Sequence, residues 1–185
     1  MEEQRRTGAK NAGRSSRQAL EEPTERIIKR RKAMTDDDSK KARPLGINHV
    51  VLEVGDLEAA LQFYGALFDF TLRGKSDHNA FIDLGDQFIQ LSLGKTQAAD
   101  EKRHFGLVVD DRERVRQALK ALGVELLGAR LNFRDPWGNR IEIVPYDDVQ
   151  FTKAPHVLKG MGAGTLKKTP NAIEELKKKG MAPDV

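Results

Sequence analysis

The strongest constraint on the fold of this chain is that it contains nearly the same pattern twice. Residues 46–94 begin with GINHVVLEVGDLEAALQFYGALF and end with DLGDQFIQLSL, whereas residues 103–145 begin with RHFGLVVDDRERVRQALKALG and end with DPWGNRIEIVP. Each half predicts one strand, one helix and then a run of short strands. Two such units place equivalent side chains at equivalent points, so polar positions that recur are the first candidates for a site between the halves.

Two polar positions recur in this way. Each half has a histidine early in its first strand, His49 or His104, and an amide or acid in its last strand, Gln90 or Glu142. Two imidazoles and a carboxylate brought together are a ligand set that binds divalent metals. The duplication therefore predicts a metal site to which both halves contribute.

The predicted elements follow from periodicity and capping residues. A strand is expected over Ile47–Val54, and Asp56 is a good N-cap for a helix that begins at Leu57 and carries one apolar stripe. The first half then continues with strands at Phe70–Lys75, Asn79–Leu84 and Gln87–Leu93. The second half predicts a strand at Arg103–Val109, a helix capped by Asp110 or Asp111 and ended by Gly123, and strands at Val124–Leu127, Ala129–Phe133 and Arg140–Pro145.

Alternation along these strands predicts which face each side chain occupies. Strand side chains point to opposite faces in turn, and the more apolar face is expected to pack on the helices. This places all four candidate ligands on the opposite face. The same alternation adds candidate walls of a substrate pocket, and Asp83 as a candidate general base if one is needed. The predicted pocket residues are Phe81, Phe88, Asn132 and Arg134.

The two ends differ in composition from the body, which we place at residues 44–150. Residues 1–43 carry 13 basic and 8 acidic side chains with almost no apolar periodicity, which predicts a disordered charged leader. Met34 is an alternative start, in which case residues 1–33 are not translated. Residues 151–185 are expected to be a tail with one short helix, Asn171–Lys179, which begins after Thr169-Pro170 and ends at Gly180.

Composition restricts the possible partners and location. The net positive charge belongs to the leader, because the other 142 residues hold 19 basic and 20 acidic side chains, and this argues against nucleic-acid binding by the domain. There is no cysteine, so disulfides and thiolate ligands are excluded and a cytoplasmic location is the default. No apolar run approaches the roughly 20 residues that a membrane span needs.

At this point the sequence resembles a known group of proteins. The segments INHVVLEVGDLEAALQFYGALFDF, RHFGLVVDD and FRDPWGNRIEIV are similar to those of the vicinal-oxygen-chelate superfamily, which includes glyoxalase I, bleomycin-resistance proteins, fosfomycin-resistance enzymes, extradiol dioxygenases and methylmalonyl-CoA epimerase. The resemblance implies an α+β fold of two βαβββ modules that form a half-open mixed β-barrel. It says less about the reaction, because this fold supports many chemistries.

The resemblance also implies roles for the recurring residues. His49, His104 and Glu142 match the positions of the metal ligands, and Gln90 matches a fourth position that binds metal in some members. Glu142 can also act as a catalytic base in glyoxalase-type sites. The implied cofactor is a divalent metal: Fe, Mn, Ni, Co or Zn.

Two function classes lead at this stage, and a regulatory or interaction protein that uses the leader or the C-terminal helix is a third. One is a metal-dependent enzyme acting on a small oxygen-chelating substrate, by isomerase or lyase chemistry, ring-opening dioxygenation or group transfer. The other is a metal-free protein that sequesters a small molecule, as the bleomycin-resistance members do. Either is expected to be a homodimer without a membrane partner.

Overall fold

The first half of the repeat folds as one module of helix and sheet. In the computed structural model, which describes residues 42–182, it consists of β1 (His49–Val54), α2 (Leu57–Leu67), β2 (Leu72–Lys75), β3 (Asn79–Asp83) and β4 (Phe88–Leu93). Asp56 caps α2 as predicted, because its carboxylate accepts a hydrogen bond from the Ala59 amide at 2.8 Å. The strands pair in the order β1-β4-β3-β2, with β1 parallel to β4.

The second half repeats this plan with one strand fewer. It contains β5 (Phe105–Val109), α3 (Arg112–Ala121), β6 (Asn132–Arg134) and β7 (Arg140–Pro145), paired in the order β5-β7-β6. Asp111 is the N-cap of α3, and Gly123 ends the helix region at φ 67°. The predicted strand Val124–Leu127 is reduced to one bridge between Leu126 and Phe133, and the next strand starts later than expected. The left-handed Gly128 (φ 75°) and the bend after it interrupt the ladder here.

Strand register confirms that the two halves are equivalent. In the first module, Val51 of β1 lies opposite Gln90 of β4. In the second, Gly106 of β5 lies opposite Glu142 of β7. Because Val51 and Gly106 each follow a repeated histidine by two residues, Gln90 and Glu142 occupy the same place in the two modules.

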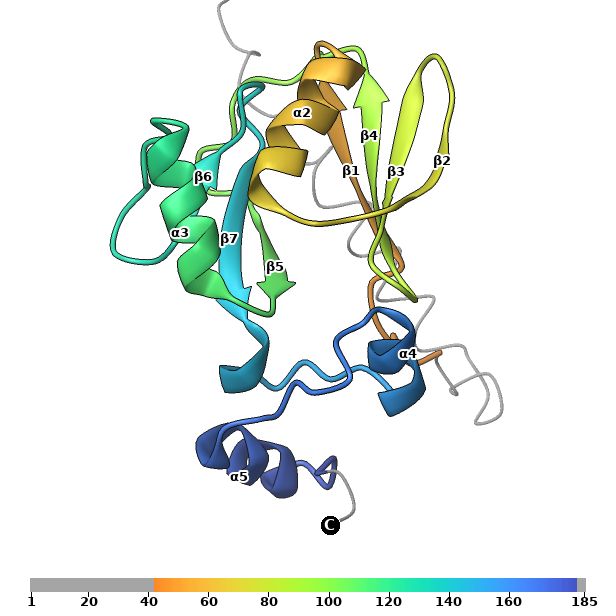
Figure 1. The fold of residues 1–185 in the computed structure, drawn as a ribbon, viewed down its shortest axis with the longest axis vertical. Helices are drawn as coiled ribbons and strands as arrows, with labels where there is room; N and C mark the ends of the chain where they lie inside the picture. Colours follow the sequence, from red (N-terminus) through yellow and green to blue (C-terminus); the bar gives the residue numbers. More distant parts are fainter. Residues whose placement is uncertain (1–41, 183–185) are drawn as a thin grey trace, which may run out of the picture. The chain divides into compact units, whose positions relative to one another are not determined.

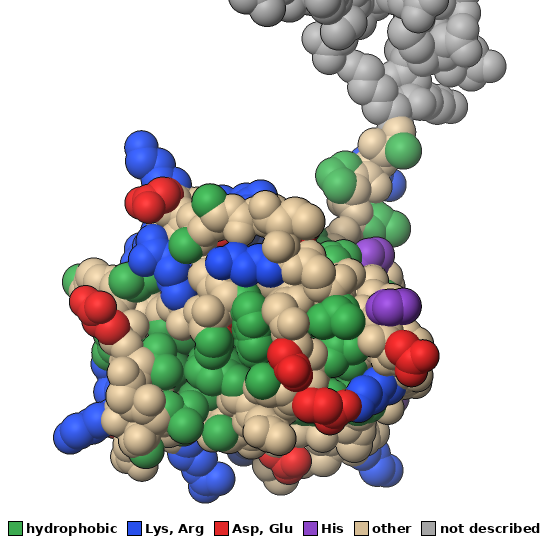
Figure 2. Space-filling model, turned by 90° about the horizontal axis from the view of Figure 1, so that it is seen from above, with side chains coloured by type: hydrophobic (Ala, Val, Ile, Leu, Met, Phe, Trp, Pro, Cys, Tyr) green, Lys and Arg blue, Asp and Glu red, His purple; other side chains and the backbone are tan. Residues whose placement is uncertain are grey.

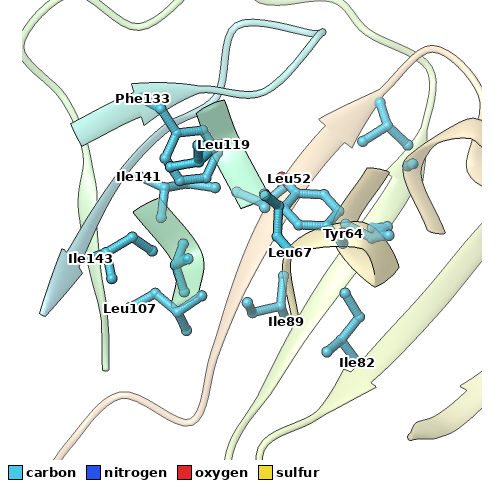
Figure 3. Packing of buried hydrophobic residues seen from close by; sticks show 14 of the residues in the cluster. Leu52, Tyr64, Leu67, Ile82, Ile89, Leu107, Leu119, Phe133, Ile141 and Ile143 are labelled. Atoms are coloured by element: carbon cyan, nitrogen blue, oxygen red, sulfur yellow. The ribbon is translucent and has the colours of Figure 1, made fainter. Parts of the chain in front are cut away.

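The two modules share one core on the helix side of their sheets. Helix α2 packs on β4 and on α3, and α3 packs on β7 (Figure 1). Figure 3 shows Phe133, Ile141 and Leu107 on one side of this core and Leu52, Tyr64 and Ile89 on the other. The α+β fold of two related modules is therefore as predicted. The two sheets are not paired with each other by strand hydrogen bonds within the described residues.

The chain continues past β7 into an extension that packs on the modules. It contains a short 3-10 turn (Tyr146–Asp148), α4 (Pro155–Gly160), which was not predicted, and α5 (Pro170–Lys178), which was predicted within one residue. Lys168 holds the extension together, because its ammonium group donates to the carbonyls of Tyr146, Val149 and Phe151. Burial lowers the pKa of this lysine from its ordinary value.

The leader and the alternative start at Met34 fall on residues 1–41, outside the described part of the chain, and residues from Ile47 onward form a unit of their own. Between residues 42 and 182 no helix is long and apolar enough to cross a membrane.

Figure 2 shows one face of the molecule, where hydrophobic side chains gather in the middle and charges of both signs surround them. This face therefore has no continuous basic stripe of the kind that binds nucleic acid.

Candidate metal centre

The four predicted ligands lie on the sheet faces that are turned away from the helices. Along β4 and β7 the residues next to Gln90 and Glu142 are buried isoleucines and leucines, whereas Gln90 and Glu142 themselves are partly exposed. His49 begins β1 and His104 directly precedes β5, and both are exposed. Alternation along the strands thus predicted the faces correctly, since it depends only on local backbone geometry.

The second module brings His104 and Glu142 together. The Nε2 atom of His104 lies 3.3 Å from a carboxylate oxygen of Glu142, whose side chain is 16% exposed. Two atoms that each bind one ion at about 2.1 Å are separated by roughly 3.0–3.4 Å for octahedral to tetrahedral geometry. The separation of these two atoms therefore fits a pair of ligands to a single metal ion.

The hydrogen bonding of His104 adds a second reason to place a cation here. Its Nδ1 atom lies 3.0 Å from the carbonyl oxygen of Lys102, which can only accept, so Nδ1 carries the proton. In the neutral imidazole Nε2 is then an acceptor that faces the carboxylate of Glu142, another acceptor. The pair is stabilised only when the imidazole is protonated or when a cation lies between them. Metal-bound histidines commonly have their other ring nitrogen fixed in this way.

Three further residues shape the space around Glu142. Arg130 donates to the second carboxylate oxygen at 3.2 Å, although its own side chain is 80% exposed. Asn132 lies opposite Glu142 in the register, is buried, and has an Oδ1 atom without a hydrogen-bond partner among the described residues. Gly106, on the other neighbouring strand, adds no side chain above the carboxylate. Glu142 therefore contacts one cationic side chain and one imidazole, and an unpaired acceptor lies on the neighbouring strand.

The first module presents an equivalent but separate pair. The ring of His49 stacks on Phe88 with centroids 4.7 Å apart, and its Nδ1 contacts the side-chain oxygen of Asn48 at 2.9 Å. This leaves Nε2 of His49 available as an acceptor. The amide nitrogen of Gln90 donates to the side-chain oxygen of Asn79 at 2.8 Å. The amide oxygen of Gln90 has no hydrogen bond within the described residues. Both groups have the electronic form that a metal ligand requires.

A single chain does not bring these two pairs together. Over the described residues, no three histidine, aspartate or glutamate side chains lie close enough to hold a metal ion. His104 and Glu142 form a close pair, whereas His49 contacts only residues of its own module. The four-ligand site consequently stays a prediction, of which the structure brings His104 and Glu142 into contact.

The other predicted site residues divide between the two modules. Phe81 and Phe88 pack edge to face with centroids 5.8 Å apart and form an apolar wall beside His49. Arg134 donates to the carbonyl of Asp100, which ties the linker between the modules to β6. Asp83 pairs with Arg73 at 3.2 Å and accepts from the Gly85 amide, so its contacts are those of a turn-stabilising residue.

Sequence reasoning missed two contacts of this face. Arg130 was not assigned a role from the sequence, and nothing in the local sequence predicts its pairing with Glu142, 12 residues away. Glu53 was also unassigned. Its carboxylate accepts hydrogen bonds from the backbone amides and side chains of Thr96 and Gln97, in the linker that follows β4.

The linker contacts of Glu53 predict a pH dependence. The amide and hydroxyl donors of Thr96 and Gln97 lower the pKa of Glu53 from 4.5 to about 2. A depressed carboxylate pKa contributes stability above the unfolded value, and this contribution is lost as pH falls from about 4.5 towards 2. Thermal melts from pH 7 to pH 2 should show Glu53→Gln less stable than wild type at pH 7, with the difference vanishing near pH 2. A constant difference across this range would contradict the assignment.

The comparisons with known proteins agree with this fold. Residues 46–143, more than half of the chain, match the family model described as the glyoxalase/bleomycin resistance protein/dioxygenase superfamily. The chain is 27% identical over 110 residues to glutathione transferase FosA of Serratia marcescens, which covers 52% of this chain and 78% of that protein. It is 26% identical over 133 residues to metallothiol transferase FosB of Bacillus licheniformis, which covers 61% of this chain and 86% of that protein.

A solved structure also aligns with it. The fosfomycin resistance protein FosX of Listeria monocytogenes superposes with a TM-score of 0.49 at 19% identity, over 56% of this chain and 94% of that one. The family match includes both modules up to β7 and leaves out the extension after it. On the strength of that match and of the two repeated modules, the chain belongs to the glyoxalase/bleomycin resistance protein/dioxygenase superfamily.

Proposed function

We propose that this protein is a divalent-metal-dependent enzyme that acts on a small molecule with adjacent oxygen ligands. The observation that carries the proposal is the contact between His104 and Glu142, where Nε2, an acceptor in the neutral imidazole, faces a carboxylate oxygen at 3.3 Å. A divalent cation between two acceptors satisfies both of them. The proposal takes further support from the metallothiol transferase among the relatives, which carries the metal in its name.

We propose further that a second copy of the chain completes the site. Each module supplies a histidine and an amide or acid on its outer face, and the described residues keep the two pairs apart within one chain. Val51, on the same face as His49, is 50% exposed, which is unusual for valine in a strand and favours a covered surface. In a homodimer, His49 and Gln90 of one protomer would face His104 and Glu142 of the other.

The residues of this chain would then have separate tasks. Glu142 and His104 hold the ion, and the carbonyl of Lys102 keeps the imidazole in the tautomer that leaves Nε2 free. When bound, the metal polarises a substrate oxygen and stabilises negative charge that develops on it. Phe81 with Phe88 provides an apolar wall on the other half of the site.

For the reaction class, group transfer from a thiol is the first to test. The two sequence relatives are a glutathione transferase and a metallothiol transferase by name, and both align over more than two thirds of their own length. Lyase, isomerase and dioxygenase chemistry remain alternatives that the same ligands support. A cytoplasmic location, where thiol cofactors are reduced, fits thiol transfer and stays a prediction.

The experiment is metal binding by titration calorimetry with Mn²⁺, Zn²⁺ and Ni²⁺, followed by an assay of thiol consumption with glutathione and fosfomycin. One ion is expected for each site that combines the first module of one protomer with the second module of the other, which is one ion per chain. Neither His49→Ala nor His104→Ala should bind metal tightly alone. Mixing the two denatured variants and refolding them together should restore one good site in each mixed dimer, because one protomer supplies His49 and the other His104.

The opposite outcomes are equally specific. If the wild type binds none of the ions, His104 and Glu142 form an imidazolium–carboxylate ion pair. The protein is then better explained as a metal-free protein that binds a small molecule. If metal binds but mixed dimers show no recovery, both pairs come from one chain and the modules must rearrange. If metal binds but no thiol is consumed, transfer of a thiol to fosfomycin is excluded. The assignment of the metal site is not affected by that result.

Arg130 predicts a separate effect on metal affinity. Its guanidinium occupies the second oxygen of Glu142 and competes with any cation for that carboxylate. Because the side chain is 80% exposed, the ion pair contributes at most about 1 kcal/mol. Arg130→Gln is therefore expected to bind Mn²⁺ about 2- to 5-fold more tightly by calorimetry. Arg116→Gln, which breaks an exposed pair on α3, is the matched control. Weaker metal binding in Arg130→Gln would show that the arginine supports the site.

A further inference from the structure

A cavity lies on the helix side of the sheets, away from the candidate metal centre. It measures about 640 Å³, within the range of roughly 300–1,000 Å³ typical of small-molecule sites. Its walls come from the ends of α2 and β3, from the end of β5 with the start of α3, and from the extension after β7. None of His49, Gln90, His104 or Glu142 lines it. Neither the metal centre nor the family match, which ends before the extension, accounts for it.

The interior of this cavity is mostly apolar. Ile82, Ile89 and Leu107, which are buried members of the shared core, form its floor. The extension adds a wall of small and apolar residues. These are Leu158, Met161, Gly162, Ala163 and Leu166. An apolar surface of this size favours a ligand with a hydrocarbon or aromatic body, since its burial contributes about 25 cal/mol per Å².

The wall formed by the extension is fixed at several points. Lys153, almost buried, pairs with Asp86 in the β3–β4 turn. Gly85 in the same turn lies so close to α4 that an added Cβ would be 2.7 Å from the sulfur of Met161. Beyond the wall, Lys168 binds three carbonyls of the extension. The extension, which forms this wall of the cavity, is thus held both by contacts with the β3–β4 turn and by hydrogen bonds within itself.

The charges at its rim are unbalanced. Most charged lining residues have a partner: Asp83 pairs with Arg73, Asp111 with Arg114 and Lys153 with Asp86. Asp69, after α2, and Asp110, after β5, are exposed lining residues, and neither has a basic group within 4.0 Å among the described residues. One carboxylate thus comes from each module, at the edge of an apolar interior.

From this combination we infer that the cavity binds a small apolar molecule that carries one positively charged group, such as a primary amine. The apolar body lies against Ile82, Ile89 and Leu107, and the ammonium group lies at the rim, on the side where Asp69 and Asp110 line the cavity. A negatively charged analogue of the same length would meet repulsion from both carboxylates. The inference does not depend on the metal centre.

The test uses three probes of equal chain length and different charge: octylammonium chloride, 1-octanol and sodium octanoate. Titration calorimetry and methyl chemical shifts of the full-length protein measure their binding. Octylammonium is expected to bind at least about 10-fold more tightly than octanoate, with a preference that weakens as salt is added. Shifts should appear at Met161, Leu158 and Leu166. Octylammonium that does not saturate the protein, or octanoate that binds equally well, would overturn the inference.

Two variants separate the contributions of charge and shape. Asp69→Asn combined with Asp110→Asn should reduce the preference for octylammonium over octanoate to about 3-fold or less while 1-octanol binding is kept, whereas Asp77→Asn, an exposed control outside the cavity, should change nothing. Ala163→Phe fills the cavity and should abolish binding of all three probes. If Ala163→Phe does not fold, the paired asparagine variant decides alone. Calorimetric Mn²⁺ binding should be unchanged in the paired variant, which keeps this test independent of the proposed enzyme function.

Discussion

Replacing Glu142 by glutamine is expected to weaken binding of divalent metal by at least about 100-fold, and to abolish any metal-dependent turnover. Loss of a residue that only orients a metal ligand typically costs 10- to 100-fold in affinity, so loss of a charged ligand should cost more. Glutamine keeps the shape of the side chain and one acceptor oxygen, but it removes the negative charge that offsets the cation. Calorimetric titration with Mn²⁺ and Zn²⁺ measures the change directly.

Two controls make this result specific to the site. Glu125→Gln removes an exposed carboxylate that has no ion pair within residues 42–182, and it should leave metal affinity unchanged. The melting temperature of metal-free Glu142→Gln should stay close to that of wild type, because Glu142 lies on the outer face and outside the core. If metal affinity survives in Glu142→Gln, this carboxylate is not a ligand, and the contact with His104 is an ordinary ion pair.

The second large effect concerns the stability of the contact between the modules. Asp135, 4% exposed, accepts hydrogen bonds from the Tyr64 hydroxyl and the Asn139 side chain on one oxygen, and from the amides of Trp137 and Asn139 on the other. Asn139 also donates to the carbonyl of Glu53 in the first module. Asp135→Ala leaves four donors without their acceptor. We expect a loss of about 3 kcal/mol in the free energy of unfolding, measured by urea denaturation.

A graded series tests how this loss arises. Tyr64→Phe removes one donor and should cost about 1–2 kcal/mol. Asp135→Asn places an NH₂ group against two donors and should fall between these two variants. Asp77→Asn, in the exposed β2–β3 turn, should change stability by less than about 0.5 kcal/mol. If Asp135→Ala is as stable as Asp77→Asn, the buried hydrogen bonds do not hold the modules together.

The pH dependence of this series has a defined sign. Burial raises the pKa of Asp135 above its ordinary value, against the hydrogen bonds that favour the ionised form. A raised carboxyl pKa contributes stability that is present below the unfolded value of 3.8 and lost as pH rises through the folded value. Asparagine has no such titration, so the stability gap between wild type and Asp135→Asn should widen as pH is lowered from 7 towards 4.

Much of the fold was predictable from the sequence because its signals are local. Asp56 and Asp111 precede apolar stripes of helical period, and each was observed as an N-cap. The alternation in β4 and β7 assigned the faces of Gln90 and Glu142, since neighbouring residues of a strand must point to opposite sides. The prediction failed at Val124–Leu127, where Gly128 takes a left-handed conformation that no count of apolar residues reveals.

The site was predictable only in part, for a physical reason. Sequence alone determined that His49, Gln90, His104 and Glu142 occupy repeated positions on the outer faces, because duplication and strand alternation are properties of the chain itself. Which of these side chains meet depends on which strands pair within a module, as β5 pairs with β7, and on how the modules pack, which long-range contacts such as Tyr64 with Asp135 decide. The tertiary structure therefore decided that His104 and Glu142 form a pair, that Arg130 shares the carboxylate, and that the extension forms one wall of a cavity.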